Sequence, residues 1–354
     1  MSEQDKSNEL AALVVDAISN KRVLNITGGN SKAFYGRKAE GEVITTSEHS
    51  GVTNYEPGEL VITARAGTRL NEIESLLKSK NQRLVFEPPH FSDTATLGGA
   101  IATGINGLCR PWSGSARDSV LGVKMINGQA EILSFGGEVM KNVAGYDISR
   151  LMTGSLGTLG ILLEVSLKVL PLSEKTETII IDCNDANVIQ RCVEINKQFL
   201  PVTAMTYYNK QLYIRLSGNA ASVDAAVKQL EGDVNEAKDF WNSIKEQTHS
   251  FFNQAGTLWR ISVPPAASWM KELSGEWLID WAGAQRWFIS DMEVEDIRKK
   301  VKAANGHATI FRNDNNADDV FQPLTSAQLH IHRMIRKAFD PNNVFNSGRL
   351  YKNI

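Results

Sequence analysis

Two glycine-rich stretches, residues 96–103 and 154–160, contain the residue types that most readily surround a phosphate group. Glycine lets the backbone approach a ligand closely and adopt positive φ, and neighbouring threonine or serine hydroxyls can donate hydrogen bonds to phosphate oxygens. A third stretch, Gly-Gly-Asn-Ser at residues 28–31, follows a short apolar run, where consecutive backbone N–H groups can cradle a pyrophosphate. Alone, this third stretch is more typical of a surface turn. Together, the three stretches predict a buried anionic cofactor.

Hydrophobic spacing predicts the elements that lead into residues 28–31 and into residues 96–103. Residues 8–20 have the apolar spacing of a helix, and the apolar residues at 23–26 indicate a short strand before residue 28. A second strand is expected over residues 60–64. Thr68 is expected to be the N-cap of the helix that follows, and an irregular segment then leads into residues 96–103.

The second half of the glycine-rich region has the pattern of a sheet. Asn127-Gly128 between two apolar runs predicts a β-hairpin. The stretch 154–160 runs directly into a strand that Pro171 ends. Apolar residues alternate with Glu164, Ser166 and Lys168 in this strand, so we expect one buried face and one solvated face.

Composition limits the class of protein. The chain has 354 residues, enough for two domains with sizeable cores. Its 38 basic and 40 acidic side chains give a net charge of −2, which favours neither a nucleic-acid binder nor an acidic tail. We therefore expect no nucleic acid among its partners.

Cysteines and apolar runs bear on the compartment. Three cysteines without C-x-x-C spacing favour a reducing cytoplasm and predict no zinc or iron–sulfur site in this chain. The first residues are polar and acidic, so we expect no signal peptide. The most apolar run, residues 159–170, is too short and too charged to cross a bilayer. We expect a cytoplasmic protein that reaches the inner face of the cytoplasmic membrane only through partners.

After Pro171 glycine becomes rarer, and charged helices are expected around residues 221–248 and 292–304. We therefore divide the chain into residues 1–171, 172–326 and 327–354. Tryptophans gather in residues 277–288, which indicates core packing or, alternatively, an interface.

The motifs, taken in order and with their spacing, resemble the FAD-binding fold of the vanillyl-alcohol oxidase superfamily, also called the PCMH-type fold. The resemblance spans residues 20–171, and Lys-Asn-Val-Ala-Gly-Tyr-Asp at 141–147 is similar to the branch of D-lactate dehydrogenases and glycolate oxidase flavin subunits. The length, the tryptophan-rich segment and the ending at 337–351 resemble the FAD-binding subunits of glycolate oxidases. The implied fold is α+β, with a two-subdomain PCMH-type FAD-binding domain, a small α+β cap domain and a C-terminal tail that returns to the FAD domain.

The resemblance also implies roles for individual residues. The stretch 28–31 and the stretch 96–99 would hold the FAD pyrophosphate, and residues 157–161 would lie beside the ribose, the adenine or the flavin ring. Arg110 and Arg117 are candidates to balance the phosphate charge, with a solvated surface ion pair as the alternative. In the tail, Ser347 stands where the family has a proline in an Asn-Pro-Gly-Arg turn near the cofactor. The cofactor-binding residues expected are Gly28, Gly29, Asn30, Ser31, Thr96, Leu97, Gly98, Gly99, Thr103, Gly107, Arg110, Ser113, Gly114, Arg117, Gly157, Thr158, Gly160, Ile161 and Arg349.

Attachment of the cofactor is expected to be noncovalent. In the superfamily a histidine of the first glycine loop usually carries the covalent link, and this chain has Asn30 and Ser31 there. Cys109 offers a thiol, but a free cysteine is more often a small buried hydrophobe.

No catalytic residue or metal site can be assigned from the sequence. The His-Gly-Asp-Gly type of metal-binding motif found in the related catalytic subunits is missing, and His330 and His332, two apart on an expected helix, would not face each other. The resemblance therefore implies an FAD-binding subunit that works with a larger catalytic FAD subunit and an iron–sulfur subunit in oxidising glycolate to glyoxylate. Two alternatives remain open. One is a stand-alone FAD oxidoreductase of a small 2-hydroxy acid such as D-lactate, with His90 or a cap residue as base. The other is a non-catalytic assembly subunit.

Overall fold

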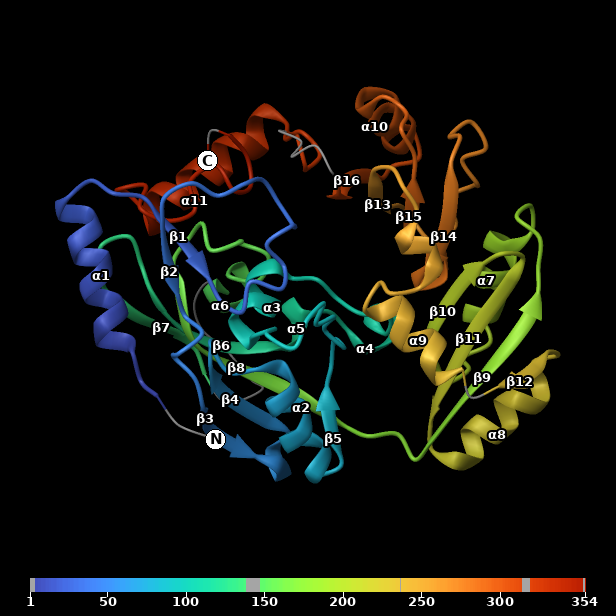
Figure 1. The fold of residues 1–354 in the computed structure, drawn as a ribbon. Coiled ribbons are helices and arrows are strands. Elements are labelled where there is room, and N and C mark those ends of the chain that lie inside the picture. Colours follow the sequence, from blue (N-terminus) through green and yellow to red (C-terminus); the bar gives the residue numbers. More distant parts are fainter. Residues whose placement is uncertain (1–3, 138–146, 236, 314–318, 353) are drawn as a thin grey trace. The chain divides into compact units, whose positions relative to one another are not determined.

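The chain forms two compact units, which are drawn in Figure 1. The computed structural model describes residues 4–137, 147–235, 237–313, 319–352 and 354. Unit 1 comprises Met1–Asn106, Ser115–Leu172 and Pro323–Ile354, and unit 2 comprises Gly107–Gly114 and Ser173–Gln322. The short segment Gly107–Gly114 thus belongs to unit 2, although the residues on both sides of it belong to unit 1.

Unit 1 is built on a six-stranded antiparallel sheet with β8 (Ile161–Pro171) at its centre. β8 pairs with β4 and β6, and its far end also pairs with β5. The hairpin expected around Asn127-Gly128 is confirmed as β6 and β7, and the expected end of the strand at Pro171 is confirmed too. The remaining bounds are β3 (Val52–Glu56), β4 (Val61–Arg65), β5 (Gln82–Leu84), β6 (Val120–Ile126) and β7 (Ile132–Gly136).

The expectation of a solvated face along β8 is wrong at its middle. Ser166 is buried and shares a hydrogen bond of 2.8 Å with the Thr63 hydroxyl of β4. Glu164, which is partly buried, lies 3.3 Å from Lys124 of β6. Because β8 has a neighbouring strand on each side, its polar side chains find partners inside the sheet instead of water.

The helices of unit 1 follow the expected apolar spacing. α1 spans Ser7–Ser19, α2 spans Leu70–Ser79, and α11 spans Ser326–Phe339. The predicted N-cap of α2 is wrong, because the cap residue is Arg69. The fully buried Thr68 hydroxyl instead accepts a hydrogen bond from Gly51 N–H and donates one to Gly51 C=O. The short helices are α3 (Leu97–Thr103), α5 (Ala116–Ser119) and α6 (Ile148–Leu151).

Two apolar clusters of described residues contribute to the core of unit 1. The larger one packs α2 and α3 against the six-stranded sheet through residues such as Leu70, Ile73 and Leu97. The smaller one joins α1 to a two-stranded parallel sheet, β1 (Leu24–Thr27) and β2 (Glu42–Thr45). Phe345 of the C-terminal tail is fully buried in this smaller cluster. The expected return of the tail to the FAD-binding fold is therefore confirmed.

Unit 2 contains an eight-stranded sheet in the order β12-β9-β11-β10-β14-β15-β13-β16, in which neighbouring strands pair antiparallel. Its strands are β9 (Lys175–Asp182), β10 (Val202–Tyr208), β11 (Gln211–Gly218), β12 (Asp233–Asn235), β13 (Leu258–Ser262), β14 (Glu276–Asp280), β15 (Gln285–Ile289) and β16 (His307–Arg312). Its helices are α4 (Arg110–Ser113), α7 (Val188–Asn196), α8 (Ala220–Gln229), α9 (Lys238–Lys245) and α10 (Val294–Ala303).

The tryptophan-rich segment forms core in unit 2. Trp281 and Trp287 are buried, and Trp277 stacks on the fully buried Phe288 with ring centroids 4.2 Å apart. Core packing is thus the structural role of these rings, and the interface reading is not supported.

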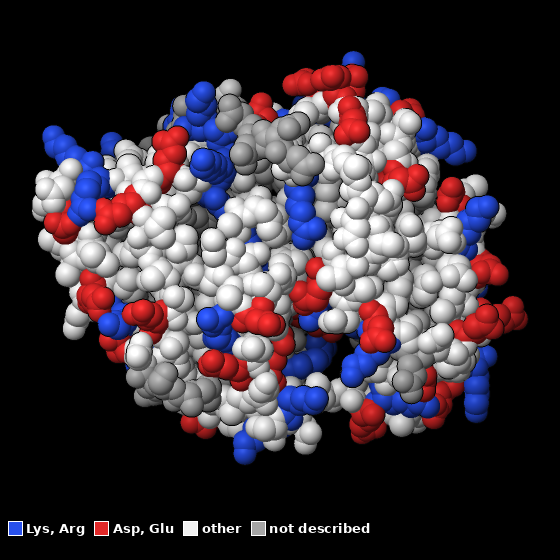
Figure 2. Space-filling view, in the orientation of Figure 1, with Lys and Arg blue, Asp and Glu red and all other residues white. Residues whose placement is uncertain are grey.

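Two further observations concern the surface. On the face shown in Figure 2, basic and acidic side chains are interspersed, as expected from the nearly balanced charge. Within the described ranges, each helix is too short or too polar to cross a bilayer.

Candidate cofactor site

Residues 28–31 leave the end of β1 as a short run of unpaired backbone donors, of which only that of Asn30 belongs to an exposed residue. No acceptor among the described residues pairs with the backbone N–H groups of Gly28, Gly29, Asn30 and Ser31. Asn30 has a positive φ of 59°, a conformation that asparagine tolerates better than most residues. Unpaired backbone N–H groups that follow one another in a loop form a concavity suited to an anion.

The glycines in this run are required by close packing. An ideal Cβ on Gly29 would lie 1.4 Å from the carbonyl oxygen of Thr94, and one on Gly28 would lie 2.5 Å from the Thr96 hydroxyl oxygen. The Thr94 hydroxyl also donates a hydrogen bond to the Gly29 carbonyl. Residues 28–31 therefore lie directly against the segment that begins α3.

In the stretch 96–103, residues 97–103 form the short helix α3, and Thr96 is its N-cap. The N–H groups of its first turn already have partners: Leu97 donates to Thr68 C=O at 2.9 Å, Gly98 to Ala66 C=O at 2.7 Å, and Gly99 to the Thr96 hydroxyl at 3.3 Å. This stretch offers an anion close backbone approach instead of free N–H donors.

The stretch 154–160 packs against the other end of α3. Gly154 N–H donates to Ile101 C=O at 3.0 Å, and Leu156 N–H donates to Ala102 C=O at 2.8 Å. The structure thus joins two stretches that the sequence separates.

Farther along this stretch, side chains point into the protein. The Thr158 hydroxyl donates to Ser155 C=O at 2.7 Å, and Ile161 is fully buried at the start of β8. An ideal Cβ on Gly160 would lie 2.3 Å from the terminal methyl carbon of Met125. A cofactor contact from these residues would have to come from their backbone.

Asn346 of the C-terminal tail bonds to both sides of the candidate site. Its side-chain oxygen accepts from Ile26 N–H at 2.7 Å, and its side-chain nitrogen donates to Leu156 C=O at 2.7 Å. The side chain is only 4% exposed, and it lies against Gly157, whose φ is +71°. Sequence reasoning missed Asn346, because its partners are distant along the chain.

A buried ion pair shapes the tail before Asn346. Arg336 donates to Asp340 at 3.1 Å and to the carbonyls of Phe345, at 2.8 Å, and Thr158, at 3.4 Å. The Asp340 carboxylate accepts the N–H groups of Val344 and Phe345, both at 2.9 Å. Burial raises the pKa of Asp340 and lowers that of Arg336, but the bonds compensate both charges.

Two more cationic side chains lie near residues 28–31. Arg349 donates to the carbonyls of Ala33, at 2.9 Å, and Tyr35, at 2.8 Å, so it fixes the backbone that follows Ser31. Lys32, which the sequence analysis did not single out, is buried, with its ammonium 3.3 Å from both the Ser31 hydroxyl and His90 C=O. A positive charge therefore lies next to the unpaired N–H groups.

The remaining candidate residues are divided between the two units. Gly107, Arg110, Ser113 and Gly114 belong to unit 2, where Arg110 lies over the Trp281 ring, 4.8 Å from its centroid. Arg117 is exposed on α5 of unit 1. Neither arginine has a carboxylate within 4 Å among the described residues, so the surface ion pair considered as an alternative does not form within them.

Comparison with known proteins agrees with this geometry. Residues 4–136 match the family model of the FAD binding domain. Over 351 residues, which is 99% of both chains, the sequence is 46% identical to glycolate oxidase subunit GlcE of Escherichia coli (strain K12). The chain belongs to the GlcE family.

More distant relatives agree in part of the chain. Glycolate oxidase subunit GlcD of Bacillus subtilis (strain 168) is 32% identical over 144 residues, which is 40% of this chain and 30% of that protein. A solved structure of alkyldihydroxyacetonephosphate synthase superposes with a TM-score of 0.66 at 14% identity, over 96% of this chain and 75% of that one. This structural likeness shows the shared fold, which is the expected α+β PCMH-type fold with a second, antiparallel sheet.

Histidines in this GlcE-family chain do not gather into a recognisable catalytic group. His90 lies in unit 1 with its Nε2 3.2 Å from the Glu74 carboxylate. His332 packs edge-on against Tyr351, with ring centroids 6.0 Å apart, whereas His330 is exposed. Within the part of the chain that is described, three or more possible metal ligands do not come together. The motif at 141–147 lies outside the described residues except for Asp147, the N-cap of α6.

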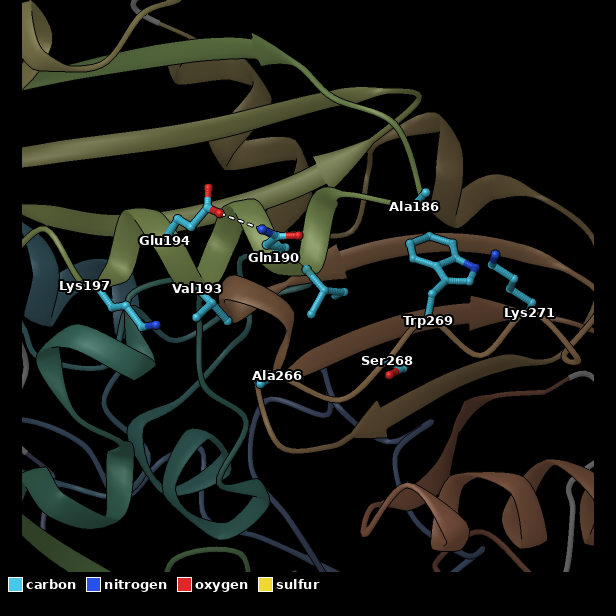
Figure 3. A pocket seen from close by; sticks show the side chains of 10 residues that line it. Ala186, Gln190, Val193, Glu194, Lys197, Ala266, Ser268, Trp269 and Lys271 are labelled. Carbon is cyan, nitrogen blue, oxygen red and sulfur yellow. Dashed lines mark hydrogen bonds between the residues drawn. The ribbon is translucent and has the colours of Figure 1, made fainter.

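Unit 2 of the GlcE-family chain carries a groove of about 500 Å³ beside α7 (Figure 3). Ile189, Val193 and Trp269 give it apolar walls, and Lys197 and Lys271 lie on its lining. Glu194 accepts a hydrogen bond of 2.8 Å from Gln190. The lining therefore combines apolar side chains with two ammonium groups and one carboxylate.

A strained turn in unit 2 contains a buried carboxyl group. Trp281, Ala282 and Gly283 follow one another with φ of 51°, 53° and 100°. Asp280, just before them, accepts hydrogen bonds from Trp281 N–H at 2.8 Å, from the Thr206 hydroxyl at 3.1 Å and from the Gln285 amide at 3.2 Å. Burial raises the pKa of Asp280 to about 7.

We expect Asp280 to make the stability of the chain depend on pH. Its pKa is raised on folding from an ordinary value of 3.8, so the stability that the neutral form contributes is complete below that value and is lost as the pH rises through about 7. Between these values the urea midpoint of the wild type, followed by tryptophan fluorescence, should fall more steeply than that of D280N. Equal slopes would show that Asp280 does not titrate in this range.

We expect Asn346→Ala to destabilise the chain by about 2 kcal/mol or more, because Ile26 N–H and Leu156 C=O both lose a buried partner. Urea unfolding of the cofactor-free chain measures the effect. Asn342→Ala is the control, since the exposed Asn342 donates a single bond, to Gly128 C=O. A midpoint for N346A no lower than that of N342A would contradict the role given to Asn346.

Proposed function

We propose that this chain is the FAD-binding subunit of a glycolate-oxidising complex and that it binds FAD noncovalently. In that complex it takes part in oxidising glycolate to glyoxylate and passes electrons toward an iron–sulfur subunit. The observation that supports this role best is the 46% identity to a glycolate oxidase subunit over almost the entire chain. We propose residues 1–171 as the FAD-binding domain, residues 172–326 as the cap and residues 327–354 as the returning tail.

The residues of unit 1 fit a dinucleotide cofactor. The unpaired N–H groups of residues 28–31 supply donors for a pyrophosphate, and the buried ammonium of Lys32 adds a compensating charge. The segment that begins α3 lies against Gly28 and Gly29. Gly157 lies against Asn346 of the tail, which also bonds to Ile26 of β1. Arg349 would act by fixing the loop after Ser31.

The residues available in these segments support a noncovalent cofactor. Asn30 and Ser31 occupy the loop where a linking histidine is found in the superfamily. Cys109, the thiol nearest in sequence to the glycine stretches, is buried at the start of α4. A buried thiol is poorly placed to form a covalent bond with a flavin.

FAD supplies the redox chemistry, and the protein supplies binding and orientation. The tail contributes through Asn346 and Arg336, which bond to carbonyls of the stretch 154–160. Asn346 also bonds to Ile26 of β1, the strand that leads into residues 28–31. Among the described residues no base can be assigned. We propose that a larger catalytic FAD subunit oxidises glycolate and that the partners bring the complex to the inner face of the cytoplasmic membrane.

The first test is the colour of the purified chain. We expect a yellow protein that releases free FAD on acid precipitation and stays oxidised when glycolate is added anaerobically, because this subunit depends on its partners for the substrate reaction. Bleaching by glycolate alone would instead support a stand-alone oxidoreductase with a base such as His90. A colourless chain that cannot be reconstituted would leave only an assembly role.

A glycine pair tests the site itself. Gly29→Ala should lower the FAD content at least about tenfold, because its Cβ cannot fit beside the Thr94 carbonyl without moving the loop. Gly58→Ala is the control, since a Cβ at Gly58 meets nothing within 4 Å. Absorbance at the flavin band, relative to protein, measures the content, and circular dichroism checks that both variants fold. Full FAD content in G29A would contradict the assignment.

A further inference from the structure

Phe199 is the most exposed large apolar side chain among the described residues, with an exposed fraction of 98%. It lies in the turn between α7 and β10. Its φ is +54°, a left-handed conformation that glycine usually adopts after a helix and that a bulky residue disfavours. Such a residue, with its ring in water, contributes nothing to the core of its own chain. Backbone strain of this kind is typical of sites that serve a function.

The groove beside α7 lies next to this ring. Lys197 lines the groove and comes two residues before Phe199, and two residues of chain span at most about 7 Å. Ile189 and Val193 lie two turns and one turn before Lys197, and Trp269 lines the groove from outside the helix. Single exposed apolar side chains are common, but an exposed ring beside an apolar groove indicates an interaction site. We call the groove and Phe199 together the α7 surface.

The charges on the α7 surface are not balanced. One oxygen of the Glu194 carboxylate accepts from Gln190 at 2.8 Å, and the other lies 3.8 Å from Arg191. By contrast, no carboxylate of the described residues lies within 4 Å of the ammonium groups of Lys197 and Lys271. Figure 3 shows these two lysines toward opposite ends of the groove, with apolar side chains between them. The surface therefore matches a partner in which carboxylates border an apolar side chain.

Three kinds of occupant differ in what they would cover. A small molecule in the groove would leave the Phe199 ring in water. A second copy of this chain would bring its own Lys197 together with its Phe199, so that ammonium groups would meet ammonium groups. A segment of another protein covers both the groove and the ring, and its carboxylates pair with the lysines. Exposure and charge together therefore favour a protein partner with acidic residues.

We propose that the α7 surface is where a partner subunit of the glycolate-oxidising complex docks, through a segment in which an apolar side chain lies between carboxylates. This inference rests on the proposed function, which supplies the partners. The groove receives the apolar side chain, Lys197 and Lys271 pair with the carboxylates, and Phe199 packs against the partner beside the groove. These residues all belong to unit 2, so the docking site is complete within one unit.

The test co-expresses the tagged full chain with the larger catalytic FAD subunit and the iron–sulfur subunit and measures how much of each the tag captures. We expect F199D and K197E/K271E each to lower the capture of at least one partner subunit about tenfold or more. The first change removes an aromatic contact, and the second reverses both unpaired charges. K197R/K271R keeps both charges and should capture the partners as the wild type does.

V234D is the matched control, because Val234 is another exposed apolar residue of unit 2, on β12. It should capture the partners normally. The side chain of Phe199 is in solvent, so F199D should keep the FAD content and the urea midpoint of the wild type. Capture by the wild type should also weaken as salt is added, since the pairing is between charges at the surface.

Each contrary result has a separate meaning. Normal capture by F199D or K197E/K271E, or an equal loss in V234D, would overturn the inference and leave the proposed function intact. Normal capture combined with lost binding to phosphatidylglycerol vesicles would assign the surface to a membrane, and combined with lost self-association it would assign the surface to a second copy. A wild-type chain that captures neither subunit would overturn the proposed function, and the inference with it.

Discussion

The candidate site depends on two hydrogen bonds from one side chain, that of Asn346. These bonds join β1, which leads into residues 28–31, to Leu156 in the stretch 154–160. Leaving a buried polar group unpaired costs more free energy than pairing it gains. Loss of the Asn346 side chain would therefore be costly, because Ile26 N–H and Leu156 C=O would both lose their buried partner. The buried pair of Arg336 and Asp340 fixes the backbone on which Asn346 stands, so the tail is a structural part of the site.

The glycine stretches 28–31 and 96–99 differ in whether their backbone N–H groups are paired. The backbone N–H groups of residues 97–99 donate to acceptors of the protein, and Gly98 allows α3 to lie against Ala66. At residues 28–31 the N–H groups remain unpaired, and the glycines allow the loop to lie against Thr94. Similar composition thus produces a packing surface at residues 96–99 and a set of unpaired donors at residues 28–31. The difference arises because carbonyl groups of Ala66 and Thr68 accept the N–H groups of α3, whereas no described acceptor pairs with those of residues 28–31.

This difference explains how far the sequence could be interpreted. The FAD-binding fold, the family and most elements of unit 1 were predictable, because ordered motifs and apolar spacing are local signals. The N-cap pattern at Thr96 would have revealed α3, had it been weighed against the glycines. The buried Ser166 and the bonds of Thr68 could not be predicted, because Thr63 and Gly51 become their partners only in the folded sheet. The place of Arg110 was hidden for the same reason, since Trp281 lies far along the chain.

The parallel bridge between Leu24 and Phe345 has a consequence for biosynthesis. A ribosome releases the first residues of a chain long before the last, so β1 emerges without the neighbour beside which it finally lies. The loop that follows β1 therefore stays incomplete until residues 345–349 have been synthesised. Cofactor capture would then follow their synthesis, and a chain that stops before Phe345 would lack the contacts that complete the loop.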